Sequence, residues 1–414
     1  MNKESQTVQR VIGLDAHPDS FTAALVRGPT PAAAVVEKVF NKLPLGQLLS
    51  WAQKHTTPED VICLEASGNS FDIVRKLAAL PRQARVLEST HLGKLKEAHA
   101  NNDKISAVRI AKAYLAGTAK EVWVPDQKTQ ERRDWFHAYR KATKRTTQAH
   151  NSLLSFLSDN GVRLAKGTRP ATNPQAEAII RQAKDWPARQ WQVIEGLLMQ
   201  VRHAHQQRAH WHSLIAQEVL GDPELLSLVR LCGVRELVAF ALGAFIGDIH
   251  RFAQPKKLVS YVGLHPVFDD SGEGEWSGGI GGHGRKDLRS LLVEAAQAIL
   301  RSSKTPLAKW GKRLLAKKGQ INLVVAAIAR KLTVAIWYLL MGRWTALEEL
   351  DPPLEIKVNK MIGAVGQPGL KALGKSRQDY RQEIHQRLKT GRTYVLDPNK
   401  TYTPTANAPA LPSA

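Results

Sequence analysis

Two acidic residues each end an apolar segment of the length of a buried strand. Asp15 follows the run VIGL, and Glu65 follows the run VICL. In an open sheet covered by helices, functional residues gather where the parallel strands end. Two carboxylates on neighbouring strands can bind Mg²⁺ or Mn²⁺, and such ions assist phosphodiester cleavage. The alternative is that both acids are ordinary turn residues at the ends of strands.

A third acid opens a segment with helical spacing. Asp103 lies in the sequence NNDKISA, at the start of a predicted helix that runs to Leu115. Ser106 follows three residues later and shares a helix face with Asp103. The local sequence is equally typical of an N-cap followed by a solvated turn.

A serine begins the most glycine-rich part of the chain. Ser271 opens the segment SGEGEWSGGIGGHG, in which seven of fourteen residues are glycine, and this composition predicts a loop or turn-rich segment. A serine next to glycine can expose its hydroxyl as a nucleophile. Since no Asp/His triad spacing is evident, a metal or another domain would have to activate it. The alternative is a flexible loop whose backbone N–H groups bind phosphate.

The elements around these residues change in type along the chain. The first hundred residues predict a hairpin, a helix, a strand, a helix and a strand, which indicates a mixed sheet with helices packed on it. Two long helices are expected at Thr129–Ser158 and Pro187–Leu220, as a spacer or coiled-coil arm. From residue 226 the pattern is mainly helical. The apolar segment Ile321–Met341 has Arg330-Lys331 at its centre, so we expect a buried or interface helix rather than a membrane span.

These patterns predict four parts. They are an α/β catalytic domain at 8–126, a helical spacer at 127–225, a mainly α C-terminal domain containing the serine at 226–350, and a tail at 351–414. The last fourteen residues carry no charge and are rich in Thr, Pro and Ala, so the end of the tail is expected to be disordered. The two cysteines, Cys63 and Cys232, cannot form a disulfide framework and fit a reducing cytoplasm.

The charge favours a polyanionic partner, with a solvated basic surface as the alternative. The net charge is +22, whereas residues 1–80 carry eight basic and eight acidic residues, so the excess lies further along the chain. Residues 128–145 carry seven basic and two acidic residues, and residues 283–318 carry ten and two. The aromatic residues of the first block are expected to pack in the core rather than stack on bases. The candidate nucleic-acid contacts are Arg132, Arg133, Arg140, Lys141, Lys144, Arg145, Arg285, Lys286 and Arg289.

Several segments, taken in order, resemble the DEDD transposases of the insertion-sequence-110 type, whose relatives include Piv-like DNA invertases. In the first third they are VIGLDAH, CLEASGNSFDIVRKL and NNDKISAVRIAKAYL. Later segments are LVRLCGVRELVAFALGAFIGDIHRF, KKLVSYVGLHPVFDDSG and GGHGRKDLRSLLVEAAQAI. The resemblance covers roughly residues 10–345, and the order and spacing of the motifs make it specific.

The resemblance implies a ribonuclease H-like, RuvC-like N-terminal domain followed by a helical spacer and a transposase domain. It implies that Asp15, Glu65 and Asp103 bind Mg²⁺ or Mn²⁺, and that Ser271 attacks DNA and holds a transient phosphoserine. The partners implied are donor and target DNA, a structured bridge RNA, and further copies of the chain in a dimer or tetramer. The implied location is the bacterial cytoplasm, in association with the nucleoid.

The sequence departs from the family pattern at one position of the acidic set. Ser106 stands where the family has its fourth acid, and serine is a poor Mg²⁺ ligand. Water could fill that position, another acid could replace it, or the protein could be inactive. Two alternative functions follow: a RuvC-like junction nuclease that uses water, and a catalytically disabled nucleic-acid-binding protein. Within the segment LVRLCGVRELVAFALGAFIGDIHRF, Cys232-Gly233-Val234 stands where the family usually has Pro-Gly-Ile-Gly.

Overall fold

The computed structural model describes residues 9–89, 102–165, 167–271, 274–302, 304–343 and 352–390. Two compact units divide the chain, residues 1–127 and residues 128–414. The predicted end of the α/β domain at residue 126 lies beside this division. The final segment 401–414, for which disorder was predicted, lies outside the described residues.

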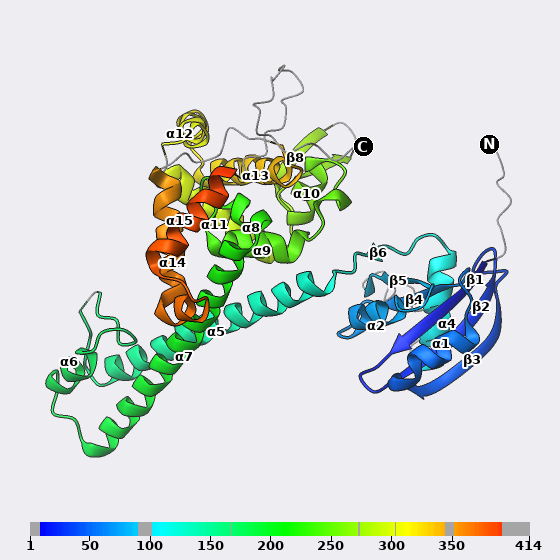
Figure 1. Cartoon of the computed structure of the whole chain (residues 1–414), viewed down its shortest axis with the longest axis horizontal. Coiled ribbons are helices and arrows are strands. Elements are labelled where there is room, and N and C mark those ends of the chain that lie inside the picture. The colour runs from blue at the N-terminus through cyan, green and yellow to red at the C-terminus, as the bar shows by residue number, and fades with distance from the viewer. Residues whose placement is uncertain are drawn as a thin grey trace. The chain divides into compact units, whose positions relative to one another are not determined.

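The N-terminal unit is built on one mixed sheet (Figure 1). Its strands are β1 (Gln9–Ala16), β2 (Ser20–Gly28), β3 (Val35–Pro44), β4 (Val61–Glu65), β5 (Gln83–Leu87) and β6 (Glu121–Val122). Their order is β3-β2-β1-β4-β5-β6. Strands β1, β4 and β5 are parallel, whereas β2, β3 and β6 each run antiparallel to the strand they join.

Helices cover both faces of this sheet. They are η1 (Leu45–Gln47), α1 (Leu48–His55), α2 (Ser70–Leu77) and α4 (Asp103–Leu115). Side chains alternate between the faces, as they must in a strand. On β1, Ile12 and Leu14 pack with α1 and α2, whereas Val11 packs with α4. On β4, Ile62 and Leu64 likewise face α1 and α2.

Besides the two-residue β6, strand β3 is an element of this unit that the sequence did not predict. It joins β2 at the edge of the sheet, and most of its side chains are exposed or half-buried. An edge strand with both faces partly in water has no alternation of apolar and polar residues by which to recognise it.

Helix α4 lies unusually close to β1. A Cβ atom added to Gly13 would stand 1.8 Å from the carbonyl oxygen of Ala107. Only glycine therefore allows the backbone of α4 to reach β1 at this point. Because Ser106 precedes Ala107, the same contact fixes the first turn of α4 against the end of β1.

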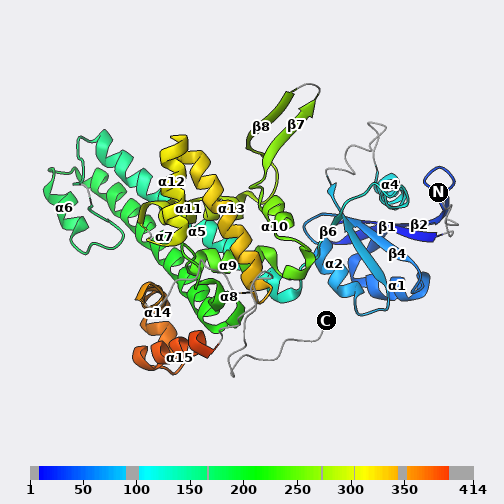
Figure 2. The ribbon, with the colours of Figure 1, turned by 90° about the horizontal axis from the view of Figure 1, so that it is seen from above.

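The C-terminal unit is mainly helical. Its helices are α5 (Gln127–Asp159), α6 (Ala176–Gln182), α7 (Ala188–Gly221), α8 (Pro223–Leu228), α9 (Glu236–Ile246), η2 (Ile249–Arg251), α10 (Pro255–Val262), α11 (Lys286–Ser302), α12 (Pro306–Lys318), α13 (Ile321–Leu340), α14 (Pro352–Ala372) and α15 (Arg377–Thr390). Its strands β7 (Pro266–Ser271) and β8 (Gly274–Ile280) form a hairpin that stands out from the helices in Figure 2.

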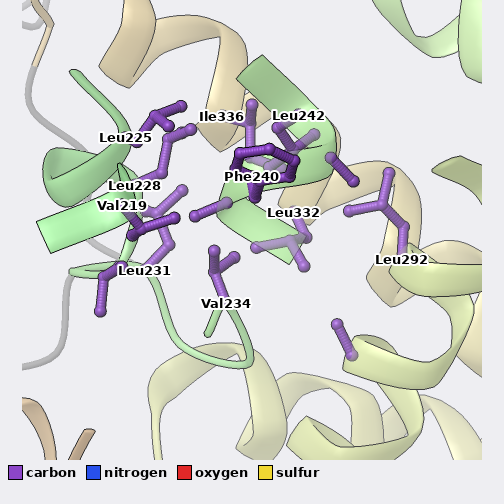
Figure 3. Close-up of a cluster of buried hydrophobic side chains, with 14 of the residues drawn as sticks. Val219, Leu225, Leu228, Leu231, Val234, Phe240, Leu242, Leu292, Leu332 and Ile336 are labelled. Carbon is purple, nitrogen blue, oxygen red and sulfur yellow. The ribbon is translucent and has the colours of Figure 1, made fainter. Parts of the chain in front are cut away.

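One buried apolar cluster holds most of this unit together. Figure 3 shows side chains of α7, α8, α9, α11 and α13 meeting around Phe240, whose ring is fully buried. Helix α13 is long and apolar enough to span a membrane, but it packs inside this cluster. Arg330, at its centre, donates to the carbonyl of Leu264 at 2.6 Å. The prediction of a buried helix is therefore confirmed for α13.

The predicted spacer is only partly separate from the rest of the unit. The two long helices α5 and α7 cross in Figure 1, and the Thr146 hydroxyl of α5 donates to the Ala204 carbonyl of α7 at 3.1 Å. The far part of the pair carries α6 and a small core of its own around Leu153 and Ile194. At the near end, Phe136 of α5 and Ile215 of α7 belong to the main cluster. These ends of the predicted spacer are thus part of the C-terminal core.

The predicted tail also contains folded structure. Helices α14 and α15 pack against the main cluster through Met361 and Ile384. Ser213 of α7 donates to the carbonyl of Val365 at 2.7 Å. Lys357 donates to the carbonyls of Val229 and Leu231 at 2.9 and 2.6 Å. The described part of the tail, residues 352–390, is therefore integral to this unit.

The close contact at Gly13 gives a test of the N-terminal fold. We expect Gly13→Ala to destabilise the unit by about 2 kcal/mol, because the new methyl group must push α4 away from β1. Native-state hydrogen exchange of the β1 amides should become about 30-fold faster. The matched control is Gly46→Ala, since a Cβ atom at Gly46 meets no other atom within 4 Å. Equal exchange rates in the two variants would contradict this account of α4.

Candidate functional site

Asp15 and Glu65 end neighbouring parallel strands of the N-terminal sheet. The pairing of β1 with β4 runs to Leu14 and Leu64, and the next residues along the two strands are Asp15 and Glu65. Since alternate residues of these strands pack with α4, both acids continue on the face that α4 covers. Both are half-buried. The structure thus places the two acids as the sequence predicted, at adjacent strand ends.

Helix α4 adds the third predicted acid to the same edge. Asn102 is the N-cap and accepts a hydrogen bond from the Ile105 N–H at 2.9 Å, so Asp103 becomes the first residue of the helix. Asp103 lies 3.6 Å from the Nε2 atom of His17. Asp15, His17 and Asp103 offer ligand atoms that all lie within 4.8 Å of one another. Glu65 stands outside this group of three.

His17 is the member of this group to which sequence reasoning gave no role. It follows Asp15 by two residues, the spacing that returns a side chain to the same face of a strand. That spacing was the available signal, within the motif VIGLDAH. Imidazole and carboxylate together suit Mn²⁺ as well as softer transition metals, whereas carboxylates alone suit Mg²⁺.

The electrostatics of Asp15 favour a bound cation. Burial raises the pKa of Asp15 above its ordinary value, and repulsion from Asp103 raises it further, although His17 and Arg109 act in the opposite direction. A divalent cation would remove that repulsion. Because the carboxylate must be ionised to bind, affinity for the cation should fall as the pH drops through this raised pKa.

Ser106 takes part in this site as a hydrogen-bonding group. It is buried, its hydroxyl makes a hydrogen bond with Asp15, and Arg109 donates to its Oγ atom at 3.3 Å. The position where the family has its fourth acid is thus directly beside Asp15. The residues present, with two grouped carboxylates, one imidazole and Glu65 on the next strand, suit a single divalent cation.

Ser271 belongs to the other unit, at the end of β7. It pairs in register with Gly274 of β8. The glycine-rich segment that was predicted to be a loop is therefore largely a β-hairpin. The prediction failed because glycines weaken the strand signal of residues 274–280. Gly272 lies outside the described residues.

Arg289 fixes the segment that follows this hairpin. Its Nη1 atom donates to the carbonyls of His283 at 2.8 Å and Gly263 at 3.2 Å. Gly263 ends α10 in the left-handed region, with φ 78°, and a Cβ atom there would stand 2.1 Å from the His283 carbonyl oxygen. The Nη1 atom of Arg289 thus donates to protein carbonyls, and its predicted contact with nucleic acid stays a prediction.

Two more predicted contacts are also occupied inside the protein. Arg132 is buried in α5 and forms ion pairs with Glu218 and Asp222, at 2.8 and 2.5 Å. Arg133 is buried and donates to the Ala244 carbonyl at 2.8 Å. Both side chains are buried and already have partners inside the unit, whereas their predicted contact with nucleic acid stays a prediction. Their spacing within a basic helix gave no sign of these buried partners.

The remaining predicted nucleic-acid contacts differ in whether their side chains form ion pairs within the protein. Arg285 pairs with Asp287 at 2.8 Å. The other five side chains are exposed and form no ion pair with any described residue; they are Arg140, Lys141, Lys144, Arg145 and Lys286. Phe136 and Tyr139 of the same helix α5 are buried, so these rings pack in the core as expected. The exposed cations of α5 and Lys286 are the side chains available for phosphate.

The region around the hairpin of β7 and β8, which contains Ser271, is similar to a known protein family. Residues 227–310 match the family described as Transposase IS116/IS110/IS902. This match runs from the end of α8 into α12 and includes β7, β8 and Ser271.

Curated relatives extend the similarity over more than two thirds of the chain. A transposase for insertion sequence element IS1111A from Coxiella burnetii is 23% identical, over 69% of this chain and 78% of its own length. A probable family 20 transposase from Pseudomonas aeruginosa is 23% identical, over 68% of this chain and 84% of its own length. A transposase for insertion sequence element IS1328 from Yersinia enterocolitica is 22% identical, over 79% of this chain and 95% of its own length.

The acidic group can be tested by metal titration. We expect Asp15→Asn to weaken Mn²⁺ binding to the full chain at least about tenfold, because it removes a charged ligand from a group of three. Isothermal titration calorimetry measures this directly. Asp19→Asn is the matched control, since Asp19 is an exposed acid four residues further along the chain. Equal affinities in wild type and Asp15→Asn would show that Asp15 is not a ligand.

Proposed function

We propose that this chain, whose residues 227–310 match the Transposase IS116/IS110/IS902 family, cuts and exchanges DNA strands through a serine nucleophile assisted by a divalent metal. Ser271 is the proposed nucleophile, and Asp15, Glu65 and Asp103 are the proposed metal ligands. The N-terminal unit would then be the RuvC-like domain that the resemblance implies.

One observation carries the catalytic part of this proposal. Asp15 at the end of β1 and Asp103 at the start of α4 are 88 positions apart in the sequence, yet their ligand atoms lie within 4.8 Å of each other and of His17. Acidic side chains that repel each other are not placed together for stability, because their repulsion costs free energy. A cation that joins them explains the arrangement, and phosphoryl transfer is the chemistry that such cations assist.

The proposed reaction begins with the Ser271 hydroxyl. Its oxygen attacks the phosphorus of a phosphodiester, so that the Oγ–P bond forms while the bond from phosphorus to one sugar oxygen breaks. The hydroxyl proton is lost, and the departing sugar oxygen takes up a proton. A hydroxyl group of another DNA strand then attacks the phosphoserine, which joins the strands and frees Ser271. When bound, Mg²⁺ or Mn²⁺ supplies charge neutralisation at the phosphate under attack.

Two neighbouring residues of this chain orient the carboxylate of Asp15. Ser106 binds the Asp15 carboxylate through its hydroxyl, and Arg109 donates to Ser106 in turn. This fixes the orientation of Asp15 without adding a negative charge. In the proposal, three acids and His17 suffice to bind one cation. Ser106 does not bind the cation itself but orients Asp15, which does.

The proposed partners are donor and target DNA, a structured bridge RNA and further copies of this chain. DNA as partner follows from the transposase domain. The excess of positive charge supports polyanion binding, and Arg140, Lys141, Lys144, Arg145 and Lys286 are the exposed cations for it. The bridge RNA and assembly as a dimer or tetramer are supported by the resemblance of the sequence motifs.

A junction nuclease that uses water is the second candidate. It is favoured because Asp15, His17 and Asp103, whose ligand atoms lie within 4.8 Å of one another, all belong to the N-terminal unit. Such an enzyme would cleave DNA without Ser271.

A protein–DNA adduct separates these functions. Wild-type protein with Mg²⁺, its element's DNA ends and structured RNA should give an adduct on a denaturing gel. We expect Ser271→Ala to abolish the adduct, because no other group can form the Oγ–P bond, and Asp15→Asn to reduce it at least a hundredfold. Ser277→Ala, on the opposite strand of the same hairpin, is the control and should leave the adduct unchanged.

Each other outcome has a definite meaning. Cleavage without an adduct in wild type, retained in Ser271→Ala and lost in Asp15→Asn, would establish the junction nuclease. Binding of DNA with neither adduct nor cleavage in any protein would contradict both catalytic functions.

A further inference from the structure

A surface hollow lies in a part of the C-terminal unit that the proposed reaction does not use. It measures about 650 Å³ and is lined by the end of α6, the first two turns of α7 and the segment between these helices. Figure 1 shows α6 beside the far ends of α5 and α7, and we call residues 150–202 of this region the arm. Seven of the nine lining residues are exposed, so the hollow is open to solvent.

One side of the hollow is formed by an arginine stacked on a tryptophan. The Cζ atom of Arg181 lies 3.8 Å from the centre of the Trp191 ring. At this distance the guanidinium lies against the face of the ring, because an approach from the edge would place it further from the centre. Trp191 is only 8% exposed, whereas the Arg181 side chain is 59% exposed. The pair therefore presents a flat cationic surface to solvent, with a buried ring behind it.

Both members of this pair are held in place. The Trp191 ring N–H donates to the carboxylate of Glu195, one helical turn further along α7, at 2.5 Å. The Nη2 atom of Arg181 lies 3.8 Å from an oxygen of Glu195 and 4.0 Å from an oxygen of Glu177. These contacts between exposed groups neutralise part of the Arg181 charge. What the fixed guanidinium offers a ligand is therefore its planar face more than its charge.

A second cation and a second ring line the same hollow. The Nζ atom of Lys184 lies 5.2 Å from the centre of the Trp186 ring and donates to the carbonyl of Asn160 at 3.2 Å. The Trp186 ring N–H donates to the carbonyl of Ile180 at 2.8 Å. The exposed amide of Gln192 adds a donor and an acceptor to the lining. The hollow thus combines flat surfaces with a few polar groups that can contact the edge of a planar ligand.

The arm as a whole carries an excess of positive charge. Residues 150–202 contain seven basic and four acidic residues. Arg163, Arg169 and Arg189 are exposed and form no ion pair with any residue in the described ranges. A polyanion is therefore the partner that this surface favours. Because the hollow is open, a free small molecule would remain largely in water, whereas a group within a nucleic-acid strand would also be held by the neighbouring phosphates.

We propose that this hollow binds an unpaired base of a nucleic-acid strand, stacked on the guanidinium of Arg181. Proteins that bind single strands combine cations along the backbone with flat side chains, either aromatic rings or guanidinium planes, on which bases stack. A base within a duplex is stacked between its neighbours and cannot enter, so the site selects unpaired nucleotides. The inference rests on the proposed function only in taking nucleic acid as the partner, and it requires neither the metal nor Ser271.

Fluorescence anisotropy in EDTA tests this site apart from the chemistry. The full chain is titrated against a labelled oligoadenylate of about 15 nucleotides, as DNA in one series and as RNA in another, each single-stranded and paired with its complement. We expect Arg181→Lys to weaken binding of the single strand about fivefold, because lysine keeps the charge and lacks the planar face. Since the charge is unchanged, the slope of log K against log salt should stay the same.

Arg202→Lys is the matched control. Arg202 also forms an ion pair with Glu177, at 3.1 Å, and its side chain is 43% exposed, but it stacks on no ring of the described residues. This variant should leave the binding of single strands and duplexes unchanged. Duplex binding should also be equal in wild type and Arg181→Lys, which shows that the variant is folded and keeps its other contacts with phosphate.

A loss in Arg181→Lys that is confined to single strands supports the site, and the series in which it occurs identifies DNA, RNA or both as the source of the base. Equal affinities of wild type and Arg181→Lys for both single strands would overturn it, and so would an equal loss on single strands and duplexes. Altered self-association in light scattering, with unchanged nucleic-acid affinities, would assign the surface to contacts between copies and likewise overturn the site. Because the assay contains no metal and forms no adduct, its result is independent of whether Ser271 is a nucleophile.

Discussion

The close approach of α4 to β1 at Gly13 is the contact on which the candidate site depends. Asp15 is fixed by the sheet and Asp103 by the first turn of α4, so their separation is set by how near the helix comes to the strand. Any side chain at Gly13 would collide with the Ala107 carbonyl. The N-cap Asn102 sets where the helix begins, and Ser106 ties its first turn to the Asp15 carboxylate. A glycine inside a buried strand is therefore a condition for the acidic group.

The basic side chains of the C-terminal unit fall into two groups, one buried and one exposed. Arg132, Arg230 and Lys357 are buried and bind carboxylates or backbone carbonyls of neighbouring elements, so they hold the helices together. The exposed cations of α5 and Lys286 have no such partner among the described residues. The net charge of +22 thus overstates the charge available to a nucleic acid, although the part on the surface remains basic.

The sequence predicts the parts of this protein that depend on local patterns. The runs before Asp15 and Glu65, and the helix from Asp103 to Leu115, form as expected because apolar spacing and capping act over a few residues. The edge strand β3 and the hairpin at Ser271 were missed, since exposed or glycine-rich strands carry little pattern. The role of Arg132 depends on partners far away in the sequence, which no local spacing reveals, whereas His17 lies only two residues from Asp15.

The most direct test of the proposed reaction asks whether a metal ion contacts the phosphate that Ser271 is proposed to attack. The adduct assay is repeated with a phosphorothioate at the scissile position, in Mg²⁺ and then in Mn²⁺. Because sulfur is a poor ligand for Mg²⁺ and a better one for Mn²⁺, we predict at least a tenfold loss of adduct in Mg²⁺ and recovery in Mn²⁺. The same yield in both metals, with or without sulfur, would contradict metal-assisted attack by Ser271.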